Sequence, residues 1–131
     1  MMPNERARLL ELLGHEGRWC RAVEARDADG RGVAYDDARA VAWDLTGALC
    51  HLFGWERARV LFAQLERHLV GRRHAPGWPV RDTAIESMTA LQAFNDRADM
   101  TFAVLRARLE SMPVWSGAAR AGTNGAGSES G

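Results

Sequence analysis

The segment at residues 41–53 carries apolar side chains on two faces of a helix, and this pattern constrains the fold more than any other feature. The two faces consist of Val41, Leu45, Ala48, Leu49 and Leu52, and of Trp43, Gly47, Cys50 and Phe53. A helix that is apolar on two sides is normally buried on two sides, so we expect this one at the centre of the fold. Asp36 or Asp37 can cap its start, and Gly54 ends it. The second apolar face could equally be buried against another subunit, which leaves a homo-oligomer open.

Helical spacing of apolar residues recurs along most of the remaining chain. It predicts helices at residues 3–13, with a continuation at 18–25, and at 55–70, 81–94 and 99–112. The segment Arg-Asp-Ala-Asp-Gly-Arg-Gly at residues 26–32 is dense in turn residues, and its Asp-Gly pair is a hairpin signal. The sequence therefore predicts an all-α fold, a small single-domain bundle of about five helices with a short turn or hairpin excursion near residues 26–36.

The chain has 131 residues, which suits one domain, and its last part changes character. Residues 1–113 form the expected helical domain, whereas residues 114–131 are rich in Gly, Ala and Ser, which predicts a disordered tail. The 17 basic residues, all arginine, balance 17 acidic residues, and this argues against a globally basic nucleic-acid binder or a cationic membrane peptide. No apolar run is long enough to predict a membrane span, and the N-terminal residues do not resemble a secretory signal. Two free thiols suit a reducing compartment, so we expect a cytoplasmic protein.

A polar cleft is one candidate site. Asp44 and His51 are seven residues apart on one face of the expected central helix, with small residues between them. A buried carboxylate that faces an imidazole could work as an acid–base pair, and Asn95 and Asp96 could complete a ligand-binding cleft. The structural alternative is that Asp44 accepts hydrogen bonds that hold a loop or an arginine in place.

Motifs for catalysis or metal binding do not stand out. The chain has no Gly-x-Ser-x-Gly, phosphate-binding glycine loop, Cys-x-x-Cys or His-Glu-x-x-His pattern, so we assign no catalytic residue, cofactor or metal and favour a non-enzymatic role. Asp27, Asp29 and Asp36 could form a loose cation site, but the spacing fails the EF-hand pattern. A turn in which Asp side chains bond their own backbone is favoured instead.

Basic residues are concentrated between Arg57 and Arg81, where six arginines face a single glutamate. Because Phe53-Gly54-Trp55 can form a tight joint between two helices, a helix-turn-helix that places this stretch on phosphates is one interpretation. Against it, the second helix buries one face in the core, and no set of base-reading side chains stands out. A solvated basic surface is the simpler interpretation.

Five tryptophans are many for this length. Trp19, Trp43 and Trp55 fall in helical patterns, which favours the core. Trp78 lies in a connector broken by two prolines, and Trp115 precedes the tail. Because tryptophan and arginine are enriched in protein–protein hot spots, we predict a partner-binding surface that consists of Trp78, Trp115, Arg72 and Arg73.

Several short strings occur in a characteristic order along residues 17–110. They are Trp19-Cys20, the acidic glycine turn at residues 25–31, Ala40-Val41, Leu45, Gly47-Ala48-Leu49, Phe94-Asn95-Asp96 and Val104-Leu105. This ordered set resembles an uncharacterised bacterial and phage domain-of-unknown-function family. The chain departs from that family in Phe94, where tryptophan is typical, and in Asp44, where an apolar residue or cysteine is common.

The resemblance implies a small cytosolic protein and supplies no activity. It implies a shared site that consists of Trp19, Asp27, Asp29, Gly30, Gly47, Asn95 and Asp96. Each of these residues also has a structural interpretation, because glycines support turns and close packing and Asn-Asp pairs join helices through bonds to the backbone.

Three classes of function follow. The small size, the absence of catalytic motifs and the tryptophan-bearing connector favour a protein-interaction or regulatory module whose partner is another protein. The alternative is a small-molecule-binding protein or enzyme with a polar cleft near Asp44, His51, Asn95 and Asp96. The third is nucleic-acid binding through residues 57–81.

Overall fold

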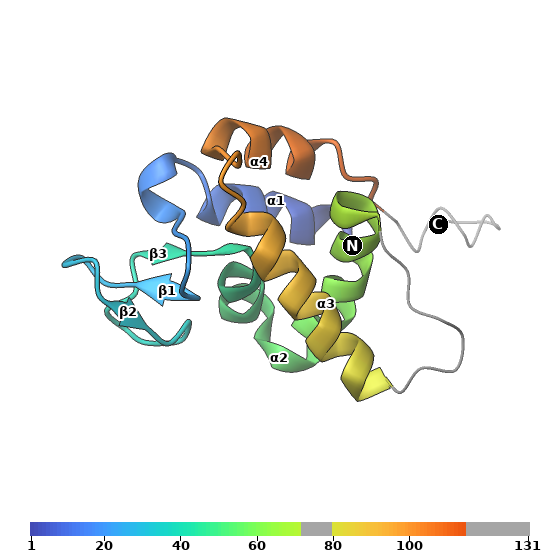
Figure 1. Ribbon diagram of the computed structural model, residues 1–131, viewed down its shortest axis with the longest axis horizontal. Coiled ribbons are helices and arrows are strands. Elements are labelled where there is room, and N and C mark those ends of the chain that lie inside the picture. Colours follow the sequence, from blue (N-terminus) through green and yellow to red (C-terminus); the bar gives the residue numbers. More distant parts are fainter. Residues whose placement is uncertain (72–79, 115–131) are drawn as a thin grey trace, which may run out of the picture.

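Helices and a small sheet together make up the part of the chain that the computed structural model describes, residues 1–71 and 80–114, with the backbone alone for residues 80–82 (Figure 1). The helical elements are α1 (Pro3–Leu12), η1 (Glu16–Arg18), α2 (Leu45–Leu65), η2 (Glu66–Val70), α3 (Val80–Asn95) and α4 (Phe102–Glu110). The strands are β1 (Ala25–Arg26), β2 (Gly32–Val33) and β3 (Ala42–Trp43). The predicted tail apart from Val114, and the residues Arg72, Arg73, Trp78 and Trp115, lie outside the described residues.

The fold class needs a correction, because the described residues are mostly helical but not all-α. The three strands form an antiparallel sheet in the order β2-β1-β3, and the described residues contain four α-helices rather than five. Ala25 of β1 pairs with Val33 on one side and with Trp43 on the other. The hairpin expected near residues 26–36 is therefore present, and β3 adds a third strand that the sequence did not predict.

Two segments expected to be helical are extended, because they lead into strands of this sheet. Residues 18–25 leave a short 3₁₀ turn and run into β1, and residues 37–43 run into β3. Backbone pairing in the sheet satisfies their N–H and C=O groups in place of a helix. Trp43, in β3, is buried, whereas Val41, just before this strand, is 46% exposed, so the two do not share a buried helix face.

The central helix α2 begins at Leu45, with Asp44 as its N-cap, and not at the expected cap near residue 37. It consists of two helical halves that meet at Gly54, whose backbone is non-helical with φ 78° and ψ 163°. A position with positive φ favours glycine, because glycine has no Cβ that would clash with the backbone. The expected break at Gly54 is thus a sharp kink, and α2 changes direction there (Figure 1).

Leucine side chains from every helix meet around the second half of α2. The fully buried large residues of this core include Leu9, Leu13, Leu45, Leu49, Leu61, Phe62, Leu65, Leu91, Leu105 and Leu109. Each buried leucine contributes roughly 1.5–3 kcal/mol, so this cluster outweighs the two-residue strands in holding the fold. Trp55, expected in the core, is 37% exposed, and its ring makes a T-shaped pair with Phe62 at 5.9 Å between centroids.

The remaining helices follow the predictions closely. α1 spans Pro3–Leu12 and α3 spans Val80–Asn95, each within a residue or two of the expected bounds. α4 begins at Phe102 because Thr101, and not Asp99, accepts the capping bond from the Val104 N–H at 3.2 Å. Asp99 pairs instead with Arg97. In the described part of the chain, no helix combines the length and apolar character needed to cross a bilayer.

Candidate functional site

The start of α2 is a closed polar joint around Asp44. The Asp44 side chain is buried, and its Oδ1 accepts hydrogen bonds from the Gly47 N–H at 2.6 Å and the Thr46 hydroxyl at 3.1 Å. The Asp44 N–H donates to the Glu24 carbonyl at 3.2 Å, which ties α2 to the sheet. Asp44 is therefore the N-cap of the central helix and does not lie along its face. This is a structural role, but its side chain accepts bonds from the helix itself and not from the loop or arginine considered for it.

Asn95, at the end of α3, completes the joint from the other side and has no exposed surface. Its Oδ1 accepts from the Trp19 indole N–H at 2.8 Å and from the Leu45 N–H at 3.1 Å. Its Nδ2 donates to the Cys20 carbonyl at 3.1 Å and to Asp96 Oδ1 at 2.9 Å. Two acceptor and two donor positions is the full capacity of an amide side chain. The Asn95 side chain thus has no free hydrogen-bonding position for a ligand.

Asp96 and Arg21 clamp the loop before β1 to the joint between α3 and α4. Asp96 Oδ1 accepts from the Ala22 N–H at 3.0 Å. Ala22 has a φ of 72, in the left-handed region that a side chain disfavours. The Arg21 guanidinium donates to the carbonyl oxygens of Arg97, at 2.8 Å, and Met100. These bonds hold the strained residue in place.

His51 does not belong to this joint. Its Nδ1 lies 3.1 Å from the Tyr35 carbonyl oxygen, which also accepts from the Trp43 indole N–H. The imidazole is exposed and packs against the Trp43 ring, with 4.6 Å between centroids. The structure therefore brings Asp44, Asn95 and Asp96 together at the start of α2, while within the described residues His51 makes its contacts with the sheet side. No acid–base pair of Asp44 and His51 forms.

Burial raises the pKa of Asp44 from its ordinary value of 3.8 to about 6. The bonds from Gly47 and Thr46 oppose this increase, and the negative charges of Asp96 and Glu24 add to it. Because the folded state holds the proton more tightly than the unfolded state, the contribution of Asp44 to stability is fully present below about pH 4 and is lost as the pH rises through about 6.

Replacing Asp44 by asparagine is expected to remove this loss. The amide oxygen can still accept from Gly47 and Thr46, and asparagine is a good N-cap. At pH 7.5 Asp44→Asn should be more stable than the parent protein by on the order of 1–3 kcal/mol, and the difference should shrink toward zero near pH 4. Urea unfolding followed by circular dichroism across this range measures the effect.

Asp37→Asn is the matched control for this experiment. Arg39 holds the pKa of Asp37 at about 2, so Asp37 stays charged through the same pH range. Because the unfolded carboxyl titrates near 3.8, its replacement should shift stability by the same amount at every pH between about 5 and 8. A constant difference for Asp44→Asn as well would show that Asp44 does not titrate in this range.

The other predicted polar features are also structural. Asp27 Oδ1 accepts from the N–H groups of Asp29, at 3.0 Å, and Arg31, at 2.9 Å. Gly30 takes a positive φ in the same turn. This confirms that an Asp side chain organises the turn through its own backbone. In the described residues no group of three His, Cys, Asp or Glu side chains is placed to hold a metal.

The two cysteines are free and buried. Burial raises the pKa of Cys20 to about 12 and that of Cys50 to about 11. Since the thiolate is the nucleophile, neither sulfur is activated at neutral pH.

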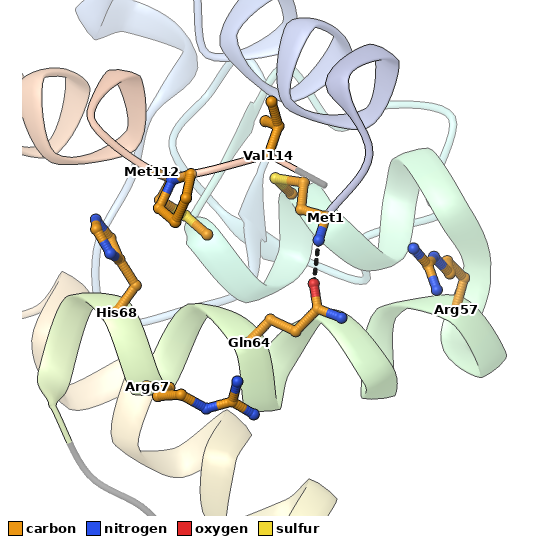
Figure 2. Close-up of a pocket in the computed structure, with 8 residues that line it drawn as sticks. Met1, Arg57, Gln64, Arg67, His68, Met112 and Val114 are labelled. Carbon is orange, nitrogen blue, oxygen red and sulfur yellow. Dashed lines mark hydrogen bonds between the residues drawn. The ribbon is translucent and has the colours of Figure 1, made fainter. Parts of the chain in front are cut away.

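A basic pocket of about 530 Å³ lies on the other side of the molecule from the sheet, beside the second half of α2 (Figures 1 and 2). The name denotes the cavity whose described lining residues are Met1, Arg57, Gln64, Arg67, His68, Met112, Pro113 and Val114. Three of these side chains are basic and none is acidic. The pocket therefore favours an anionic ligand.

The polar groups of the basic pocket come from α2 and η2. Arg57 forms a two-bond pair with Glu5, with Nε at 2.7 Å and Nη2 at 2.8 Å from the two carboxylate oxygens. Gln64 accepts a hydrogen bond from the Met1 amino group, whose pKa is lowered mainly by burial. The side chain of Arg67 is exposed and makes no hydrogen bond or ion pair with the described residues. Its guanidinium is thus available to a ligand.

Sequence patterns indicate only part of this pocket. The excess of arginine after residue 57 points to Arg57 and Arg67, although it fits a phosphate-binding helix or a solvated surface as well. Met1 and Met112 are 111 positions apart in the chain, and no local pattern signals that they share a cavity. Likewise, nothing in the chain before folding links Trp19 to Asn95.

Comparison of the chain with family models, with curated proteins and with solved structures finds no significant match. The resemblance to a domain-of-unknown-function family therefore stays a prediction.

Proposed function

We propose that this protein is an interaction module that binds an acidic segment of a partner protein in the basic pocket. The observation that carries the proposal is the guanidinium of Arg67, which has no partner among the described residues. It shares with Arg57 and His68 a cavity whose described lining includes no acidic residue. A guanidinium is weakly hydrated and matches a carboxylate with two parallel bonds. Carboxylates of a partner are thus the complementary group.

The remaining walls support a protein partner. Met1, Met112 and Val114 contribute apolar surface to the same cavity. Methionine side chains are flexible and polarisable, so they adapt to different apolar side chains. A ligand that combines acidic and apolar side chains fits this lining better than a sugar-phosphate chain, because no Phe, Tyr or Trp ring for base stacking is among the described lining residues.

The closed joint at the start of α2 favours this role over the small-molecule alternative. Asn95 uses all four of its hydrogen-bonding positions within the protein, and Asp44 is occupied as a helix cap. Neither presents a free polar atom to a substrate. We also propose a cytoplasmic location, since both cysteines are free thiols.

Selection of random peptides displayed on phage tests the proposal. The immobilised baits are the parent protein, Arg67→Glu and, as the matched control, Arg59→Glu. Arg59 lies on the same helix outside the described lining, and its ion pair with Glu56 is long at 3.8 Å. We expect the parent protein and Arg59→Glu to enrich peptides with acidic and apolar residues, and Arg67→Glu to lose them.

Two results would overturn the proposal. One is the absence of acidic peptides from the sequences selected by the parent protein. The other is equal enrichment by Arg67→Glu and the parent protein, because the reversed charge would then have no effect on recognition. Circular dichroism of each bait establishes that both variants are folded.

A further inference from the structure

The basic groups of the pocket follow one stripe along α2 and η2. Arg57, Gln64 and His68 are separated by seven and four residues, which places them on the same side of a helix. Arg67 adjoins this stripe. Figure 2 shows Arg57 on one side of Gln64 and His68 on the other, with the Arg67 side chain running below Gln64 from the side of His68. The basic side chains therefore lie toward two ends of the pocket, and between them the neutral amide of Gln64 accepts a hydrogen bond from the Met1 amino group.

The separation of the two ends suits an extended peptide. Arg67 follows Arg57 by ten helix positions, which corresponds to roughly 15 Å along the axis. Residues i and i+4 of a strand are about 13 Å apart, and residues i, i+2 and i+4 point to the same face. One face of a strand can thus bring two acidic side chains to the two ends.

The centre of the pocket suits a side chain of a different kind. Met1 and Met112 contribute apolar surface beside Gln64, between the cationic ends (Figure 2). The residue at i+2 of the strand would face this surface. An apolar side chain there removes apolar area from water on both partners, which favours binding.

We infer that the basic pocket recognises an extended segment with acidic residues at i and i+4 and a large apolar residue at i+2. This inference rests on the proposed function and adds the spacing that the partner must carry. The two ends are unequal, because Arg57 already pairs with Glu5 through Nε and Nη2. Arg67 is therefore expected to contribute more to affinity than Arg57.

Two fluorescein-labelled peptides of equal composition and charge test the inference. The first contains Glu-Ser-Leu-Ser-Glu and the second Ser-Glu-Leu-Glu-Ser, each between flexible Gly-Ser ends. In a strand, the second peptide points both acids away from the face that carries leucine. Fluorescence anisotropy with the whole chain should give an affinity for the first peptide about tenfold higher than for the second, a difference of about 1.4 kcal/mol.

Variants assign the binding to the pocket. Arg67→Glu should weaken binding of the first peptide by about tenfold or more, whereas Arg59→Glu should leave it unchanged. Glu5→Gln should strengthen binding, because it releases Arg57 for the ligand. Binding should weaken as salt is added, as expected for charges at a surface.

Each contrary outcome has a separate meaning. If both peptides bind equally and Arg67→Glu weakens both, the spacing is wrong and the proposed function stands. If neither peptide binds the parent protein, the inference is wrong, and failure of the phage selection as well would overturn the proposed function. Tighter binding of a fluorescein-labelled oligothymidylate that depends on Arg67 would overturn both in favour of nucleic acid.

Discussion

Gly47→Ala is expected to destabilise the protein by on the order of 3–5 kcal/mol, a large loss for the addition of one methyl group. A Cβ on Gly47 would lie 2.9 Å from the carbonyl carbon of Glu24 and closer still to its oxygen. Both atoms are backbone and cannot rotate away. The same Glu24 carbonyl accepts the N–H of Asp44, so its withdrawal would also break the link between the sheet and the cap of α2.

Chemical denaturation of Gly47→Ala and Gly30→Ala separates this clash from ordinary glycine effects. Gly30 has a positive φ of 82, but a Cβ added there would meet no atom within 4 Å, so its replacement should cost only about 1 kcal/mol of backbone strain. Helix propensity by itself favours alanine at position 47. A Gly47→Ala variant as stable as the parent protein would therefore contradict the close approach of Glu24 to α2.

Asn95→Asp carries the second large effect. The change is nearly isosteric, yet a carboxylate cannot donate the hydrogen bonds that Asn95 gives to Cys20 and Asp96. It also places a negative charge in a fully buried position beside Asp96. Breaking a buried network and leaving an uncompensated charge costs on the order of 3–5 kcal/mol.

This loss should depend on pH. A buried carboxyl beside another carboxylate has a raised pKa, so Asn95→Asp should recover part of its stability as the pH falls and the introduced group takes up a proton. Asn4→Asp is the matched control, since Asn4 is exposed in the first turn of α1 and should tolerate the charge. Thermal unfolding at pH 5 and pH 8 measures both variants. Equal melting temperatures for Asn95→Asp and the parent protein would show that Asn95 does not hold the joint.

Helix existence is predictable wherever one face of a segment packs against the core. The spacing of Leu61 and Leu65 marks the second half of α2 correctly, and Gly54 marks the change of direction before it. The same reasoning fails at residues 18–25 and 37–43, where helical spacing is present but the backbone enters a sheet. The two-residue strands are too short for an alternating pattern to reveal them.

The sequence likewise indicates some features of the candidate site, whereas others depend on contacts between distant residues. Asp44 and Asn95 stand out because polar side chains beside apolar segments need partners, but whether those partners are a ligand or the protein itself depends on contacts across the chain. Trp19 supplies one of these contacts from 76 positions away. Arg67 shows the converse: the sequence indicates its charge, and the structure shows that it is left without a partner among the described residues.

Periodicity, turn residues and composition by themselves determined the helical character of most of the described residues, the turn at Asp27 and the break in the helix at Gly54. Each of these depends on neighbours within a few residues, so the local sequence contains the necessary information. Only the tertiary structure decided that Asp44 caps α2, that Asn95 is saturated by bonds from three segments, and that Met1 and Met112 meet beside Arg67. These features depend on contacts between residues far apart in the chain, which form only when the core brings their elements together.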